Sequence, residues 1–172
     1  MAIKLTALRN GQFLFLNLYS TTMEIIAARP EDAARLTEIA FAAKRHWGYP
    51  DRWMEIWRDD LTIAPEFIVN HETYAAVFSS QIIGFYALNQ TDDHLALLHL
   101  WVSPGWMGRG FGRTLFSHSL ERTKALGFRS LRIESDPNAE GFYRRMGARR
   151  IGVNVYTVAQ QRRELPILIC EV

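Results

Sequence analysis

The chain has 172 residues, which suits one domain with its own hydrophobic core. Its hydrophobic content of 48% and charged content of 22% are typical of globular domains and exclude a disordered chain. The net charge of +2 argues against a dedicated nucleic-acid-binding protein, and no apolar run is long enough to span a membrane. The single cysteine, Cys170, excludes an intrachain disulfide, so we expect a reducing, cytoplasmic location.

The residue pattern divides the chain into a short extension and one domain. Residues 1–22, with the apolar run FLFL, indicate an N-terminal extension that forms an extra strand or arm, and the domain is expected to span residues 23–172. In chain order, periodicity and the Gly and Pro breaks predict a strand at 23–30, helices at 31–45 and 51–61, strands at 73–78, 82–89 and 95–102, a helix at 110–126, a strand at 130–134, a helix at 137–146 and strands at 148–158 and 165–171. This order predicts an α/β fold, a single-domain mixed β-sheet flanked by helices on both faces.

Residues 97–112, LLHLWVSPGWMGRGFG, are the most informative stretch of the sequence. An apolar strand ends at Ser103-Pro104, glycines follow at 108, 110 and 112, and a helical pattern begins at once. The free N–H groups and the dipole of a helix N-terminus favour phosphate, and glycine lets the backbone approach it closely. The spacing G-x-G-x-G fits neither the dinucleotide fingerprint nor a Walker loop. We therefore predict a phosphorylated ligand of another kind, with an ordinary tight turn as the alternative.

The segment around this loop is basic, although the whole chain is nearly neutral. From Gly105 to Arg150, ten Lys and Arg stand against four Asp and Glu. Arg109, Arg113 and Arg145 are therefore candidates for steering an anionic ligand, and a solvated helix face is the alternative.

A second segment, LRIESDPNAEGFYRRMG at 131–147, gives the loop its context. Together the two segments resemble the coenzyme-A-binding core of the GNAT N-acyltransferase superfamily. The family's P-x-x-x-G-x-G-x-G-helix pattern matches within residues 97–120, and its N-x-x-(A/G)-x-x-(F/L)-Y-x-x-x-G-F/A pattern matches Asn138 to Ala148 loosely. The resemblance is specific over residues 95–152 and weaker over 23–94.

This resemblance implies the GNAT-like acyl-CoA N-acyltransferase fold and an activity. The protein would be an acetyl-CoA-dependent N-acetyltransferase, with acetyl-CoA as co-substrate and no metal. A primary amine of a small molecule or of a protein would attack the thioester directly. Neither nucleic acid nor a membrane is expected as a partner, and a homodimer is in keeping with the family.

The resemblance also implies which residues hold acetyl-CoA. The backbone groups of Trp101 and Val102 would pair with the pantetheine arm, with Asn138 and Phe142 beside it. The diphosphate would lie on the loop and helix N-terminus formed by Met107, Gly108, Arg109, Gly110, Phe111, Gly112 and Arg113. Family members often carry Gln or Arg where Met107 stands, so this chain loses one side-chain contact there.

Tyr143 is the candidate general acid, at the place of the family's tyrosine. A phenol with a pKa of about 10 is protonated at neutral pH and can serve a departing thiol with a pKa of about 8.5. A tyrosine packed in the core is the alternative. An alkylamine is almost fully protonated at pH 7, so a base must assist. The family's base often stands at positions that correspond to Ala96 and Leu98, and both are apolar here.

His99 is the first candidate for this base, although strand alternation turns it to the opposite face unless a bulge intervenes. Structural roles are the alternative for the remaining candidates, Glu134, Asp136 and His46.

The acceptor side is expected in the aromatic segment HWGYPDRWMEIW at 46–57. Trp47 and Tyr49 are the candidates for binding the acceptor, and Trp53 and Trp57 for packing a helix on the sheet. Because the usual carboxylate is missing, an acyl-CoA-binding sensor without catalysis is the alternative function. A partner-binding protein that adds its FLFL arm to another chain is a third.

Overall fold

The computed structural model describes residues 6–7, 13–14, 22–91 and 93–172. Its main sheet has seven strands in the order β3-β4-β5-β6-β7-β9-β8. These strands are β3 (Glu24–Ala27), β4 (Glu72–Phe78), β5 (Gln81–Gln90), β6 (Leu95–Val102), β7 (Ser130–Glu134), β8 (Arg149–Val158) and β9 (Gln161–Glu171). Only β6 and β7 pair in parallel, and all other neighbours are antiparallel. The sheet is therefore mixed, as predicted.

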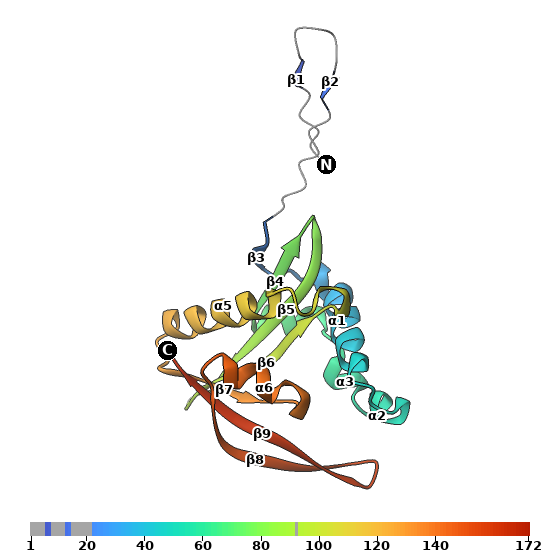
Figure 1. Cartoon of the computed structure of the whole chain (residues 1–172), viewed down its shortest axis with the longest axis vertical. Helices are drawn as coiled ribbons and strands as arrows, with labels where there is room; N and C mark the ends of the chain where they lie inside the picture. The colour runs from blue at the N-terminus through green and yellow to red at the C-terminus, as the bar shows by residue number, and fades with distance from the viewer. Residues whose placement is uncertain (1–5, 8–12, 15–21, 92) are drawn as a thin grey trace.

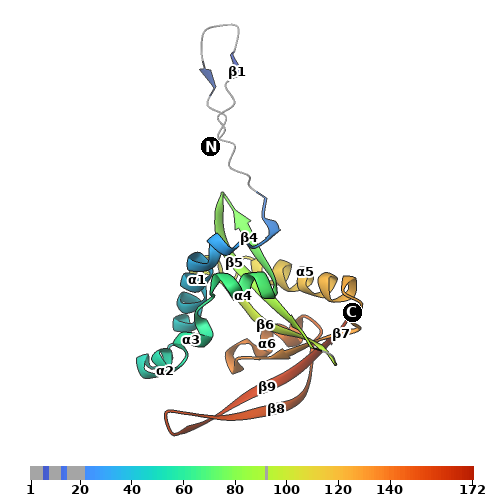
Figure 2. The same cartoon turned by 180° about the vertical axis from the view of Figure 1, so that it is seen from behind.

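Two layers of helices cover this sheet (Figures 1 and 2). The α-helices are α1 (Ala33–His46), α2 (Asp51–Ile56), α3 (Arg58–Leu61), α4 (Pro65–Asn70), α5 (Phe111–Ala125) and α6 (Glu140–Arg145), and the short 3₁₀ helices are η1 (Pro30–Asp32), η2 (Pro104–Trp106) and η3 (Pro137–Ala139). One buried cluster joins the sheet to α5 and α6, with Leu115, Phe116 and Tyr143. The other joins it to α1 and α4, with Leu36 and Ile68. This arrangement confirms the predicted fold class of a mixed sheet between helices.

Most predicted elements agree with the structure, but the last strand, predicted at 165–171, begins earlier, at Gln161 (β9). The strands predicted at 95–102 and 130–134 are β6 and β7 with those bounds. The helix predicted at 51–61 is wrong in one respect, because Trp57 interrupts it and separates α2 from α3. The helix predicted at 137–146 is wrong in its first turn, which is the 3₁₀ helix η3. Pro65 opens the additional helix α4, since proline suits a first helical position.

Part of the N-terminal extension is described. Thr6–Ala7 (β1) pairs in antiparallel fashion with Phe13–Leu14 (β2) in a separate two-stranded sheet. The rest of the predicted arm lies outside the described residues. The domain boundary at residue 23 stays a prediction. Among the helices of the described ranges, none is both long and apolar enough to cross a membrane.

The two central strands, β6 and β7, separate into a fork. They pair only over three residues, from Leu95 to Leu97 and from Leu131 to Ile133. Beyond that point β6 runs on to Val102 paired with β5 alone. A β-bulge marks the start of the fork, since Ala87 of β5 faces His99 and the next residue of β5, Leu88, faces Leu97.

Candidate active site

A cleft of about 570 Å³ opens at this fork. Both strands contribute to its wall, together with the loop before α5, the N-terminus of α5, and η3 with α6. The predicted site residues along it are Trp47, Trp101, Val102, Met107, Gly108, Gly110, Gly112, Arg113, Asn138, Phe142, Tyr143 and Arg145. The tertiary fold thus brings together residues that the sequence spreads over about a hundred positions.

Two glycines of the loop before α5 have a left-handed backbone conformation, which is strained for residues other than glycine. Gly108 has a φ of +75° and Gly110 a φ of +88°, and a Cβ at either position would meet no protein atom within 4 Å. These glycines are therefore required by backbone conformation, and the space before them is free for a ligand. Gly110 is the N-cap of α5, and Thr114 donates its N–H to the Gly110 carbonyl at 3.2 Å. The N–H groups ahead of Thr114 are those that a helix leaves for an anion.

The arginines around this loop differ in their placement. Arg113 and Arg145 line the cleft. The guanidinium of Arg109 instead lies 5.0 Å from the centre of the Trp106 ring, outside the cleft lining. Phe111 also leaves the cleft, because its ring packs 5.6 Å from that of Trp106. The side chains of Arg109 and Phe111 therefore do not line the cleft, and the predicted phosphate contacts of these two residues fall to their backbone groups.

Tyr143 reaches the cleft from the side of α5 and α6. Its ring packs edge-on against Phe116 and Phe142, with centroids 5.3 Å and 5.1 Å away, and the residue is 6% exposed. Within the described residues the Tyr143 hydroxyl has no hydrogen-bond partner. Burial raises the pKa of this phenol above its ordinary value, and Asp136 adds to the rise. The phenol is therefore protonated at neutral pH and is free to donate into the cleft.

His99 lies outside the cleft lining, in spite of the bulge beside it. Its ring sits 5.3 Å from that of Phe67 and 5.9 Å from that of Phe85, on the side of α1 and α4. Trp101 donates its indole N–H to Nδ1 of His99 at 3.1 Å. Burial lowers the pKa of His99 to about 4, with a smaller contribution from His71. This placement does not favour His99 as the catalytic base.

A cluster of buried charges closes one end of the cleft. Asp136, which lines the cleft, accepts hydrogen bonds from Lys44 Nζ at 2.6 Å and from Arg163 at 2.8 Å. Its second oxygen accepts from the Tyr49 hydroxyl at 2.8 Å and from the backbone N–H of Asn138 at 3.0 Å. Burial by itself would raise the pKa of the Asp136 carboxyl, but the adjacent Lys44 ammonium holds it below the ordinary value. The cluster thus ties α1, η3 and β9 together.

Residues 33–148, about two thirds of the chain, match the model of the acetyltransferase (GNAT) family. The chain belongs to the GNAT family of acetyltransferases. The resemblance predicted from the glycine loop and from the segment around Tyr143 is thereby confirmed. Among curated proteins, none shows significant similarity to the sequence.

Solved structures of GNAT proteins share the fold. A GCN5-related N-acetyltransferase from Rhodopseudomonas palustris is 23% identical, with a TM-score of 0.75 over 90% of this chain and 98% of that chain. The PaiA N-acetyltransferase from Thermoplasma acidophilum, solved with coenzyme A, is 21% identical, with a TM-score of 0.70 over 88% and 99%. A GNAT family acetyltransferase from Brucella melitensis, solved with acetyl-CoA, is 23% identical, with a TM-score of 0.56 over 75% and 84%.

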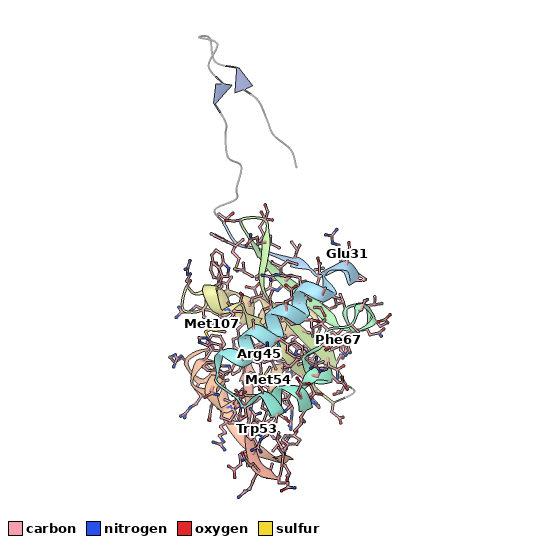
Figure 3. The ribbon with its side chains drawn as sticks, turned by 90° about the vertical axis from the view of Figure 1, so that its right-hand side faces the viewer. Glu31, Arg45, Trp53, Met54, Phe67 and Met107 are labelled. Carbon is pink, nitrogen blue, oxygen red and sulfur yellow. The ribbon has the colours of Figure 1, made fainter. Side chains whose placement is uncertain are left out.

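The two predicted acceptor-binding residues of this GNAT chain lie in different places. Trp47, at the C-terminal end of α1, is 39% exposed and lines the cleft. Tyr49 does not line it, because its hydroxyl is bound to Asp136 and its ring stacks on Trp53 at 5.8 Å. Figure 3 shows α2, with Trp53, beyond the end of α1 and over the β8–β9 hairpin, where Arg163 lies 5.8 Å from the Trp53 ring. Tyr49 therefore supports the wall of the cleft.

Sequence reasoning missed the cations of this wall, Lys44 and Arg163. They are separated by more than a hundred residues, and each has the local pattern of an ordinary surface cation. The packing of both over the ring of Trp57, at 4.3 Å and 4.5 Å, gave no signal in the sequence.

Proposed function

We propose that this GNAT protein transfers an acetyl group from acetyl-CoA to a primary amine of a small molecule or protein. The observation that carries the proposal is the continuity of the cleft. One cavity runs from the glycine loop at the N-terminus of α5, along the open part of β6, to Tyr143 and the fork. Between the anion site and the fork, the backbone groups of β6 have no hydrogen-bond partners on the β7 side. A long, thin, anionic thioester can lie along this open edge, and it fits the shape better than a compact nucleotide.

The residues along the cleft provide the groups needed to bind acetyl-CoA. The positive-φ glycines Gly108 and Gly110 leave room beside the free N–H groups of α5, and Arg113 and Arg145 add positive charge. The carbonyl and N–H groups that β6 turns toward the fork would pair with the pantetheine amides. When bound, acetyl-CoA supplies a thioester as the acetyl donor.

The reaction needs an amine nitrogen to form a bond to the carbonyl carbon while the carbon–sulfur bond breaks. Tyr143, protonated and unbound to other described residues, donates its proton to the sulfur as negative charge accumulates there. Because the pKa of Tyr143 is raised, the proton moves to the sulfur late in the reaction, when the sulfur has gained most of its negative charge. Solvent then returns a proton to the phenolate. Direct attack needs no acyl-enzyme.

Calorimetry with acetyl-CoA, and with desulfo-CoA as a second ligand, tests binding first. Micromolar affinity for both is expected. Release of free thiol from acetyl-CoA is then measured with phenethylamine, putrescine and a short peptide with a free N-terminus. Tyr143→Phe should lower kcat by about 10²-fold, the scale of general acid catalysis, and leave acetyl-CoA affinity unchanged. An unaffected kcat would remove Tyr143 from the mechanism.

Binding without turnover of any amine would instead favour the acyl-CoA sensor. A cytoplasmic location and a homodimer stay predictions, and gel filtration with light scattering tests the second.

A further inference from the structure

Two carboxylates stand at the end of β7, and both line the cleft. Asp136 is held by the cations of Lys44 and Arg163. Glu134 has no ion pair within the described residues, and its hydrogen-bond partners are the neutral donors Tyr156 and Asn154. Glu134 is therefore the cleft carboxylate that keeps an uncompensated negative charge.

The place of Glu134 in the sheet sets the direction from which it acts. It directly follows Ile133, the last residue of β7 that pairs with β6, and so stands where the fork opens. Leu131 and Ile133 pack into the core beneath α5 and α6, the side from which Tyr143 comes. Because neighbouring residues of a strand point to opposite faces, Glu134 projects to the other side, as its exposure confirms. Glu134 and Tyr143 thus approach the fork from opposite faces.

The placement of Glu134 and Tyr143 on opposite faces suits acetyl transfer, which needs one proton acceptor and one proton donor. The acceptor nitrogen and the leaving sulfur occupy different sides of the carbonyl carbon. A group that accepts the proton of the nitrogen must therefore face the acceptor, and a group that serves the sulfur must face the cofactor. Trp47 lines the same cleft from the C-terminal end of α1.

The β8–β9 hairpin holds Glu134 in place. Tyr156 donates its hydroxyl to one carboxylate oxygen of Glu134 at 2.7 Å, and the Asn154 side-chain amide donates to the other. Residues 154 and 156 lie on one face of β8, since they are two apart in a strand. Two donors on the two oxygens fix the plane of the carboxylate, while the remaining lone pairs are free for a substrate or a water molecule.

We propose that Glu134 is the general base of the reaction, and that Tyr156 and Asn154 position it. The ammonium of the acceptor loses one proton to solvent before attack. When the nitrogen bonds to the carbonyl carbon it carries a positive charge, and Glu134 takes the excess proton directly or through one water molecule. The carbon–sulfur bond breaks, Tyr143 protonates the sulfur, and solvent restores both side chains. The net products are the N-acetylated amine and free coenzyme A.

This inference rests on the proposed acetyltransferase function, and the experiment separates the two. Glu134→Gln is compared with Glu164→Gln, an exposed carboxylate of β9 paired with Arg162. Thiol release is measured with the amine that the wild-type protein uses best. Glu134→Gln should lower kcat by about 10²-fold at pH 7 and leave acetyl-CoA affinity unchanged, as removal of a base does. Glu164→Gln should behave as wild type.

A purely structural role of Glu134 is tested by chemical rescue. Added formate should restore part of the kcat of Glu134→Ala, and chloride at the same ionic strength should not. Tyr156→Phe should lower kcat about fivefold with little effect on acetyl-CoA affinity, because one hydrogen bond to a charged group is lost. The other charged and titratable groups that line the cleft are Asp136, Tyr143, Arg113 and Arg145, while Tyr156, Lys44 and Arg163 contact its two carboxylates from outside the lining.

Three outcomes would overturn the proposal. If wild-type protein turns over amines and Glu134→Gln keeps kcat within about threefold, Glu134 is not the base, and the acetyltransferase function stands. Loss of kcat in Glu134→Ala without rescue by formate, together with weakened acetyl-CoA binding, would assign Glu134 a structural role. If wild-type protein binds acetyl-CoA and acetylates no amine, the function itself fails.

Discussion

The buried charge cluster makes a strong prediction about stability. Side-chain exposure is 10% for Lys44, 11% for Asp136 and 8% for Arg163. Asp136→Asn removes the carboxylate with which both cations form ion pairs, so both stay buried without that counter-ion. Breaking a buried ion pair in this way costs about 3–5 kcal/mol. In a domain of this size that corresponds to a fall in Tm of roughly 10 °C.

Urea unfolding at pH 7, followed by tryptophan fluorescence, measures this cost. Asp59→Asn, an exposed aspartate in α3, is the matched control and should change the free energy of unfolding by less than about 0.5 kcal/mol. Adding Lys44→Met to Asp136→Asn should recover part of the loss, because one of the two unpaired cations is removed. An Asp136→Asn variant that loses less than about 1 kcal/mol would refute the view that the cluster holds this wall together.

The same cluster has a pH signature of defined sign. The pKa of Asp136 is lowered in the folded state. Its contribution to the free energy of unfolding is therefore complete above the unfolded pKa of about 3.9 and is lost as the pH falls through the folded value. The stability gap between wild type and Asp136→Asn should accordingly be constant from pH 5 to pH 7 (about 3–5 kcal/mol) and shrink below about pH 4. A gap that stays constant in acid would show that the loss comes from packing and not from charge.

Three further substitutions test the loop, the fork and the histidine. Gly110→Ala should lower the free energy of unfolding by about 1–2 kcal/mol and weaken acetyl-CoA binding, because Gly110 has a φ of +88°. Gly105→Ala, the control, should change neither quantity. Urea unfolding measures the stability, and calorimetry measures the binding. Gly84→Ala should lower the free energy of unfolding in urea by about 1–3 kcal/mol, since its Cβ would lie 2.7 Å from the Trp101 carbonyl oxygen. Gly152→Ala is the control, because a Cβ there meets only ordinary van der Waals contacts. His99→Asn should keep kcat within about threefold in the thiol-release assay, and a loss near 10²-fold would return His99 to the list of bases.

Local sequence pattern predicted the fold and the strand, glycine loop and helix that line one side of the cleft. Strand β6, the glycine loop and α5 are consecutive, so periodicity, glycine spacing and a helix start describe them together. The structure adds that Gly108 and Gly110 have a positive φ, a local requirement that glycine meets without strain. Tyr143 follows in the same way, since it lies five residues beyond Asn138 on the short helix α6, which presents it to the cleft.

Failures arose where distant segments decide the local structure. Trp57 interrupts the helix predicted at 51–61, and its ring contacts that of Tyr49, at 5.1 Å, and the guanidinium of Arg163. Arg163 is over a hundred residues away from both. Hydrophobic periodicity therefore predicts one helix where tertiary packing produces two. Long-range contacts also explain why Tyr49, a predicted acceptor-binding residue, does not line the cleft: its hydroxyl donates a hydrogen bond to Asp136.

The assignment of the base shows why residue type alone is insufficient. Glu134 and Asp136 are two residues apart and were equivalent candidates from the sequence. Asp136 receives two cations, from α1 and from β9, and its carboxylate is held as an ion that has little capacity left for a proton. Among the residues that the structure describes, Glu134 receives two neutral donors, from β8, and no cation. Elements remote in the chain thus pair one carboxylate with two cations and the other with two neutral donors, and this difference follows from where the β8–β9 hairpin places Arg163, Asn154 and Tyr156.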